Sequence, residues 1–201
     1  MMMDGIEYDI LERAVAKTAG LDGLTCEIGV RRGGSSILMM QTLESLGDKS
    51  PHVGLDPYGD IPYFEYNNDH RPVHLDYTNH MRNDAMVDLF TYVGKTRREF
   101  VFFNMEDTEF FARFADGVPI YTNGQKRIIG QYKCVFFDGP HTTKLVRSEF
   151  AFFHPRMVRG GTLVFDDIDQ YPHMAELDEY IRACGYDVIE KGARKIAYVK
   201  L

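Results

Sequence analysis

The chain has 201 residues, of which 44% are hydrophobic and 26% charged, which is typical of a folded globular protein. Its formal net charge of −7 lacks the basic excess by which nucleic-acid-binding domains hold phosphates. No apolar run of about 18 residues and no N-terminal signal core occur, so we expect a single cytoplasmic domain over residues 1–201 without a membrane segment.

Helix-like and strand-like segments alternate along the chain. In the first half, the predicted elements are a helix at 6–19, a strand at 24–28, a helix at 35–46, a strand at 52–56, a helix at 81–93, a strand at 100–103 and a helix at 106–114. In the second half, they are a strand at 133–137, a helix at 142–153, a strand at 162–165, a helix at 173–184 and strands at 186–190 and 195–199.

Two segments interrupt this alternation. Residues 57–80 are polar, aromatic and broken by prolines, so we expect an excursion over the surface. Residues 118–130 contain Asn123-Gly124, a strong hairpin signal, and we expect a small β-hairpin insertion there.

The alternation predicts an α/β fold with a doubly wound, mostly parallel seven-stranded sheet. Only a few residues around Gly192 join the last two strands. Because a parallel crossover needs about a dozen residues or more, the last strand should run antiparallel to its neighbour.

A glycine-rich turn follows the first predicted strand, with the spacing Glu27-x-Gly29-x-x-x-Gly33-x-Ser35. A strand, a tight turn and a helix N-terminus form the usual ligand-binding end of an α/β sheet. The spacing differs from the Gly-x-Gly-x-x-Gly of dinucleotide sites, and a carboxylate suits a cationic ligand better than a pyrophosphate. The amino group of S-adenosylmethionine meets this requirement, although the turn could also be a purely structural connection.

Acidic residues lie at the ends of four of the predicted strands: Glu27, Asp56, Asp138 and the pair Asp166-Asp167. The carboxyl ends of parallel strands meet at one edge of a sheet, so these acids should lie together. An acid at the position of Asp56 can hold both hydroxyls of a ribose, or it can simply begin a turn before proline.

The aspartates Asp138, Asp166 and Asp167 suggest two hypotheses about chemistry. Oxygen ligands suit Mg²⁺ or Ca²⁺, and a bound cation would relieve the repulsion among them. The alternative is that they only cap and start turns. His141, three residues after Asp138, could remove a proton from an acceptor hydroxyl or could instead begin the following helix.

These motifs resemble class I S-adenosylmethionine-dependent methyltransferases, in particular the small-molecule O-methyltransferase branch. The resemblance extends from Leu24 to Val199 and is most specific at 136–141 and 160–167, which are similar to macrocin-type and catechol O-methyltransferases. It implies a Rossmann-like methyltransferase fold. The residues it places at the cofactor are Glu27, Gly29, Gly33, Ser35, Asp56, Asp107 and Asp138.

The resemblance also implies a mechanism. Asp138, Asp166 and Asp167 would bind Mg²⁺, while His141 falls where the catechol enzyme has its basic lysine, so Asp138 and His141 are the predicted catalytic residues. Macrocin-type enzymes often carry an acid where this chain has Pro140.

We therefore predict an enzyme that transfers a methyl group from S-adenosylmethionine to a hydroxyl of a small molecule, such as a sugar, a phenol or a natural-product intermediate. One alternative is a protein that binds S-adenosylmethionine without catalysis. A nicotinamide-dependent oxidoreductase is less favoured, because the chain lacks its Gly-x-Gly-x-x-Gly and Tyr-x-x-x-Lys patterns. We expect no nucleic-acid or membrane partner, and homo-oligomer formation stays open.

Overall fold

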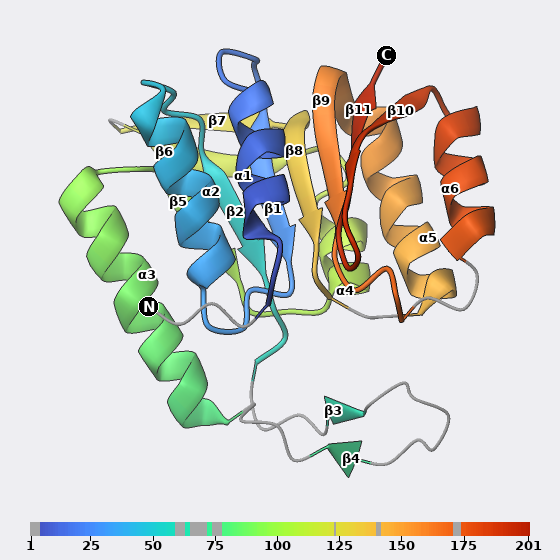
Figure 1. The fold of residues 1–201 in the computed structure, drawn as a ribbon. Helices are drawn as coiled ribbons and strands as arrows, with labels where there is room; N and C mark the ends of the chain where they lie inside the picture. Colours follow the sequence, from blue (N-terminus) through green and yellow to red (C-terminus); the bar gives the residue numbers. More distant parts are fainter. Residues whose placement is uncertain are drawn as a thin grey trace.

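The computed structural model describes residues 5–58, 63–64, 72–73, 78–122, 124–139, 142–170 and 174–201, with only the backbone at 63–64 and 72–73. A seven-stranded sheet forms its centre (Figure 1). The strand order is β10 (Tyr186–Lys191), β11 (Ile196–Lys200), β9 (Met157–Phe165), β8 (Tyr132–Phe137), β1 (Leu24–Ile28), β2 (His52–Leu55) and β5 (Phe100–Phe103).

The strand directions confirm the predicted topology. The strands β9, β8, β1, β2 and β5 are parallel, whereas β11 pairs antiparallel with both β9 and β10. The short 192–195 connection explains the reversal, because it is too short to cross over the sheet. This antiparallel strand brings the start of β11 to the edge where β9 ends, since Ile196 is opposite Phe165.

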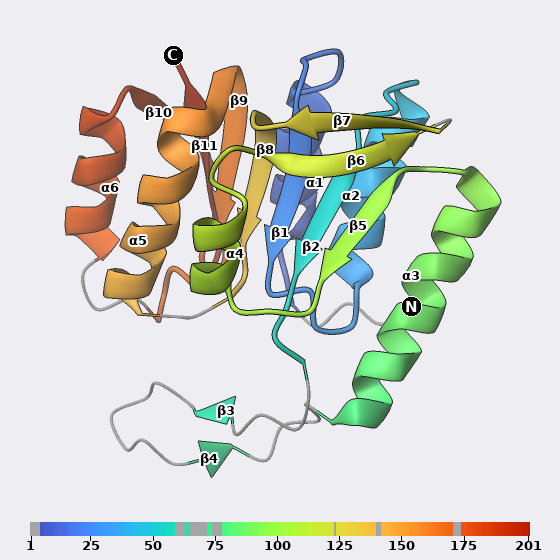
Figure 2. The same cartoon turned by 180° about the vertical axis from the view of Figure 1, so that it is seen from behind.

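Helices cover both faces of the sheet (Figures 1 and 2). One face carries α1 (Tyr8–Lys17), α2 (Gly34–Ser45) and α3 (Asn79–Thr96), and the other carries α4 (Asp107–Arg113), α5 (Thr143–Phe153) and α6 (Met174–Ala183). Strand β8 shows why two layers form: Cys134 and Phe136 pack with α1 and α2, while Val135 and Phe137 pack with α4, α5 and α6. Because side chains alternate along a strand, an apolar run without polar breaks requires cover on both sides.

Several predicted boundaries differ from the structure, and two of these differences have a clear structural cause. Strand β9 begins at Met157, five residues before its predicted start at Thr162. The Gly160-Gly161 pair lies inside this strand and does not precede it. Glycine is required at position 161 because a Cβ there would lie 2.9 Å from the carbonyl oxygens of Lys133 and Val158. Helix α3 begins two residues early, where the Thr78 side chain accepts a hydrogen bond from the Met81 N–H.

The hairpin insertion is confirmed as β6 (Val118–Thr122) and β7 (Gln125–Ile129), which pair antiparallel (Figure 2). Within 57–80, β3 (Tyr63–Phe64) pairs with β4 (Pro72–Val73), and most of the remaining excursion lies outside the described residues. Among the described helices, none combines the length and the apolar character that crossing a membrane requires.

Candidate functional site

The turn after β1 depends on glycine at two of the predicted positions. Gly29 has φ 87°, and a Cβ there would lie 2.0 Å from the carbonyl oxygen of Asp138. Gly33 has φ 76° and directly precedes α2, where a Cβ would approach the Leu89 side chain to 2.8 Å. The turn therefore brings the end of β1 into backbone contact with the segment that follows β8, a close approach that only glycine permits.

Glu27 lies inside β1 and is fully buried. Its two carboxylate oxygens accept hydrogen bonds from the hydroxyls of Ser35 and Ser36, which belong to the first turn of α2. Burial raises the pKa of Glu27 to about 8, helped by the charges of Asp56 and Asp166 and opposed by the serine hydrogen bonds. Through these hydrogen bonds, the Glu27 side chain connects strand β1 to the first turn of α2.

The polar contacts below Glu27 continue to His52, which sequence reasoning did not select. Thr25 and His52 are register partners on β1 and β2, and Thr25 Oγ1 lies 2.9 Å from His52 Nδ1. His52 Nε2 lies 3.0 Å from Ser36 Oγ. The Ser36 hydroxyl already donates its hydrogen bond to Glu27, so it can only accept from His52. The His52 ring must therefore donate from Nε2 and accept at Nδ1. Burial lowers the pKa of His52 to about 3, so this imidazole is neutral.

Asp56 follows β2 at the same edge and is fully buried, as its strand-end position predicts. Its Oδ2 accepts a hydrogen bond of 2.8 Å from the Arg31 N–H, within the glycine turn. Arg31 has φ 43°, and its carbonyl accepts a hydrogen bond from the Tyr58 hydroxyl. Asp56 thus connects the end of β2 to the turn after β1.

The ends of β8 and β9 bring Asp138 and Asp166 together, as predicted, because Phe137 is the register partner of Phe165. Burial raises the pKa of Asp138 well above its ordinary value, and the charges of Asp166 and Glu27 add to this effect. Lys195 acts in the opposite direction on the same carboxyl group. Among the described residues, Glu27, Asp138 and Asp166 therefore lie at this edge around one buried lysine, Lys195.

The chain's own cations pair with the two aspartates after β9. Lys195 Nζ lies 2.6 Å from Asp166 Oδ2, and the Asp167 N–H donates to Asp166 Oδ1 at 2.7 Å. Asp167, at φ 51°, forms an ion pair with Arg194. Both carboxylates are thus engaged by groups of this chain.

These contacts do not fit the hypothesis of a Mg²⁺ site on Asp138, Asp166 and Asp167. In the parts of the chain that the structure describes, no cluster of three or more His, Cys, Asp or Glu side chains could hold a metal ion. A divalent cation would have to displace the Lys195 ammonium and approach the Arg194 guanidinium, and like charges oppose this.

His141 lies outside the described residues, so its predicted role as a base stays a prediction. Asp107 is the first residue of α4, and its charge adds to burial in raising the pKa of Glu149.

Glu149 was not selected from the sequence, although it lies on the buried stripe of α5 with Val146, Phe150 and Phe153. Neither of its oxygens makes a hydrogen bond of ordinary geometry to the described residues. Its Oε1 lies 3.6 Å from the place of a Cβ on Gly139, just after β8. A charged residue within an apolar helical stripe was the sequence signal that could have identified it.

Solved structures show the same fold. The O-methyltransferase NovP is 18% identical at a TM-score of 0.63, with 96% of this chain and 78% of that chain covered. An O-methyltransferase from Bacillus cereus in complex with SAH is 13% identical at a TM-score of 0.61, with 99% and 83% covered. TomG from Streptomyces achromogenes, an O-methyltransferase in complex with SAM, is 12% identical at a TM-score of 0.60, with 100% and 82% covered.

By sequence, the chain matches a family model but no individual protein of curated function. The family model, described as a methyltransferase domain, matches residues 26–168, which include the glycine turn and every strand-end acid discussed above. The chain therefore belongs to this family of methyltransferase domains and has the Rossmann-like fold of class I methyltransferases.

Proposed function

We propose that the protein transfers a methyl group from S-adenosylmethionine to a hydroxyl of a small molecule. The observation that carries the proposal is the glycine turn beside the buried acids Glu27 and Asp56 and the half-buried Asp138, in a chain of the methyltransferase family. Structural neighbours bound to SAM or SAH, with TM-scores of 0.60 and 0.61, support the choice of cofactor. Their description as O-methyltransferases supports a hydroxyl acceptor.

The acidic edge suits this cofactor electrostatically. S-adenosylmethionine carries a sulfonium and an ammonium group, and both are stabilised by nearby negative charge. In the proposed arrangement, Gly29, Gly33 and Ser35 line the turn, Asp56 receives the ribose hydroxyls and Asp107 contacts the adenine. The carboxyl groups of Glu27 and Asp138 lie toward the cationic end, where a bound positive charge would favour their ionised forms.

The transfer itself is an in-line displacement in which the enzyme mainly aligns the reactants. The acceptor oxygen forms a bond to the methyl carbon while the carbon–sulfur bond breaks, and its electron pair stays on sulfur as a neutral thioether. The acceptor hydroxyl must also lose its proton. We assign this proton to His141, with Asp138 at the start of the same segment positioning it.

The proposal is tested by calorimetric titration of the purified chain with S-adenosylhomocysteine, with NAD as the control ligand. We expect saturable binding of S-adenosylhomocysteine alone, and a loss of roughly tenfold or more in the Asp56→Asn variant, because a charged hydrogen-bond acceptor is removed. Binding of NAD alone, or of neither ligand, would contradict the proposal. Binding without methyl transfer to any hydroxyl compound in an acceptor screen would favour the non-catalytic alternative.

A further inference from the structure

We propose that the Lys195 ammonium takes the place of a divalent cation in the acid cluster at the carboxyl edge, so that cofactor binding proceeds without a metal. This inference rests on the proposed function for its cofactor, but its main readout does not. The geometry that carries it is the antiparallel last strand. Because Ile196 is opposite Phe165, the residue before β11 meets the residue after β9, and these are Lys195 and Asp166.

The ammonium is held in a fixed position. Lys195 is fully buried, its Nζ lies 2.6 Å from Asp166 Oδ2, and it also lies 4.6 Å from the centre of the Tyr8 ring. A cation between a carboxylate and an aromatic face is stabilised from both sides. Removing it would leave buried carboxylates without their counter-charge.

The backbone that carries Lys195 is fixed as well. The N–H groups of Ala193, Arg194 and Lys195 all donate to the Glu7 carboxylate, at distances between 2.8 and 3.0 Å. These bonds, the Arg194 N–H first among them, hold the pKa of Glu7 below its ordinary value. The connection between β10 and β11 is thereby anchored to the residue preceding α1, and Lys195 is a positioning residue of the cofactor site.

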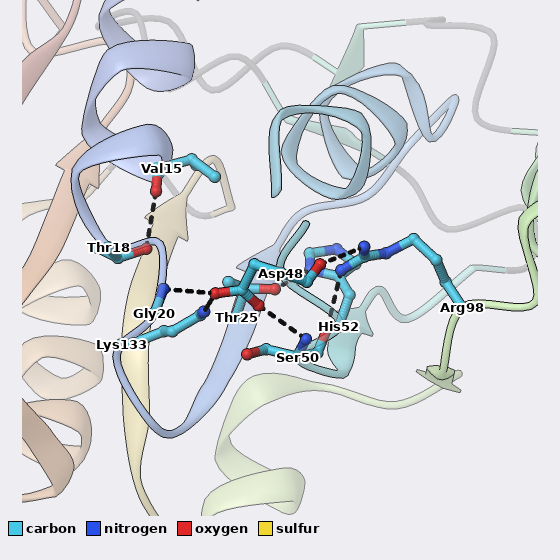
Figure 3. A network of polar contacts seen from close by, with 9 residues as sticks. All are labelled: Val15, Thr18, Gly20, Thr25, Asp48, Ser50, His52, Arg98 and Lys133. Carbon is cyan, nitrogen blue, oxygen red and sulfur yellow. Dashed lines mark hydrogen bonds and ion pairs between the residues drawn. The ribbon is translucent and has the colours of Figure 1, made fainter. Parts of the chain in front are cut away.

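The chain supplies a matched control at the opposite edge of the sheet (Figure 3). Lys133 Nζ lies 2.6 Å from Asp48 Oδ2, and the side-chain exposures of 0% and 7% equal those of Lys195 and Asp166. Asp48 also accepts hydrogen bonds from the N–H groups of Gly20 and Ser50. A variant at Lys133 thus loses an ion pair of equal geometry at a place where we expect no cofactor.

In the experiment, the wild-type chain, Lys195→Met and Lys133→Met are each titrated with Mn²⁺ alone, and electron paramagnetic resonance measures the bound Mn²⁺. We expect no stoichiometric Mn²⁺ site in the wild type or in Lys133→Met. Lys195→Met should gain one site with at least tenfold higher affinity, because Asp138 and Asp166 then lack their cation. A folded Lys195→Met variant that gains no such site would overturn the assignment.

Two further measurements test whether the site works without a metal and do not depend on the folding of Lys195→Met. One stoichiometric Mn²⁺ site in the wild type that Asp166→Asn abolishes would overturn the proposal. The second is the titration with S-adenosylhomocysteine, whose affinity should be equal within twofold in EDTA and in Mg²⁺. A requirement for Mg²⁺ would refute this inference alone, whereas no binding in either buffer would refute the proposed cofactor.

Discussion

The buried carboxyl group of Glu27 makes the stability of the protein depend on pH in a defined direction. Its pKa is about 8 in the folded chain, against an ordinary value of 4.5. Between these two values the folded protein keeps a proton that the unfolded chain has released. The free energy of unfolding therefore falls as the pH rises from 4.5 to 8, and the destabilisation is complete above pH 8.

The size of this effect follows from the interval between the two values. At about 1.4 kcal/mol for each pH unit, the interval from 4.5 to 8 corresponds to about 5 kcal/mol of lost stability. Glutamine has nearly the same shape but no proton to release, so Glu27→Gln removes this contribution. At pH 5.5 the wild type should equal or exceed the variant in stability, and at pH 8 the variant should be the more stable protein.

The assay is urea unfolding of both proteins at half-unit steps from pH 5.5 to 8.0, with the exposed substitution Glu12→Gln as the control. We expect the stability of Glu27→Gln relative to wild type to rise by about 1.4 kcal/mol per pH unit, at an unchanged denaturant slope. Parallel stability profiles would refute the reasoning. They would mean that the Ser35 and Ser36 hydrogen bonds outweigh burial and keep Glu27 ionised throughout.

Two other substitutions test the packing of the site. Gly29→Ala should cost roughly 4 kcal/mol or more in thermal unfolding, whereas Gly47→Ala, at a similar φ of 74° but with no atom within 4 Å of the added Cβ, should cost only about 1 kcal/mol; equal losses would contradict the close contact with Asp138. Glu149→Gln should stabilise the protein by roughly 1–3 kcal/mol at pH 8 and by less at pH 5, because burial raises the pKa of this carboxyl well above 4.5; a variant that is less stable at pH 8 would point to a partner for the ionised form.

The sheet was predictable because its strands are marked by local patterns. Apolar runs such as Val135 to Phe137 need no partner to be recognised, and the short connection around Gly192 settles the direction of the last strand. The strand-end acids were predictable for the same reason, since parallel strands place all their carboxyl ends at one edge. The boundaries of β9 were less clear because the glycines at 160–161 serve a close backbone approach inside the strand.

The contacts among the site residues were harder to predict, because they depend on register and not on local pattern. His52 meets Ser36 and Thr25 only when β1 and β2 align, and nothing around His52 in the sequence indicates this. Lys195 is a different case. The sequence already places it at the start of an antiparallel strand, and so at the same edge as Asp166 if the two strands are neighbours. The ion pair could therefore be predicted from the topology, whereas the acids alone left a metal site and a purely structural role as alternatives.

The two edges of the sheet show how charge is distributed for a cationic ligand. At the amino edge Lys133 pairs with Asp48, and against the effect of burial this pairing holds the pKa of Asp48 below its ordinary value. At the carboxyl edge one buried lysine faces Asp166 and, next to it, the raised carboxyls of Glu27 and Asp138. A divalent cation would neutralise more of these carboxyl groups than a single lysine does. The carboxyls that the lysine leaves unneutralised are groups whose ionised forms a bound sulfonium would favour, so a lysine in place of a metal and a cationic cofactor suit the same edge of the sheet.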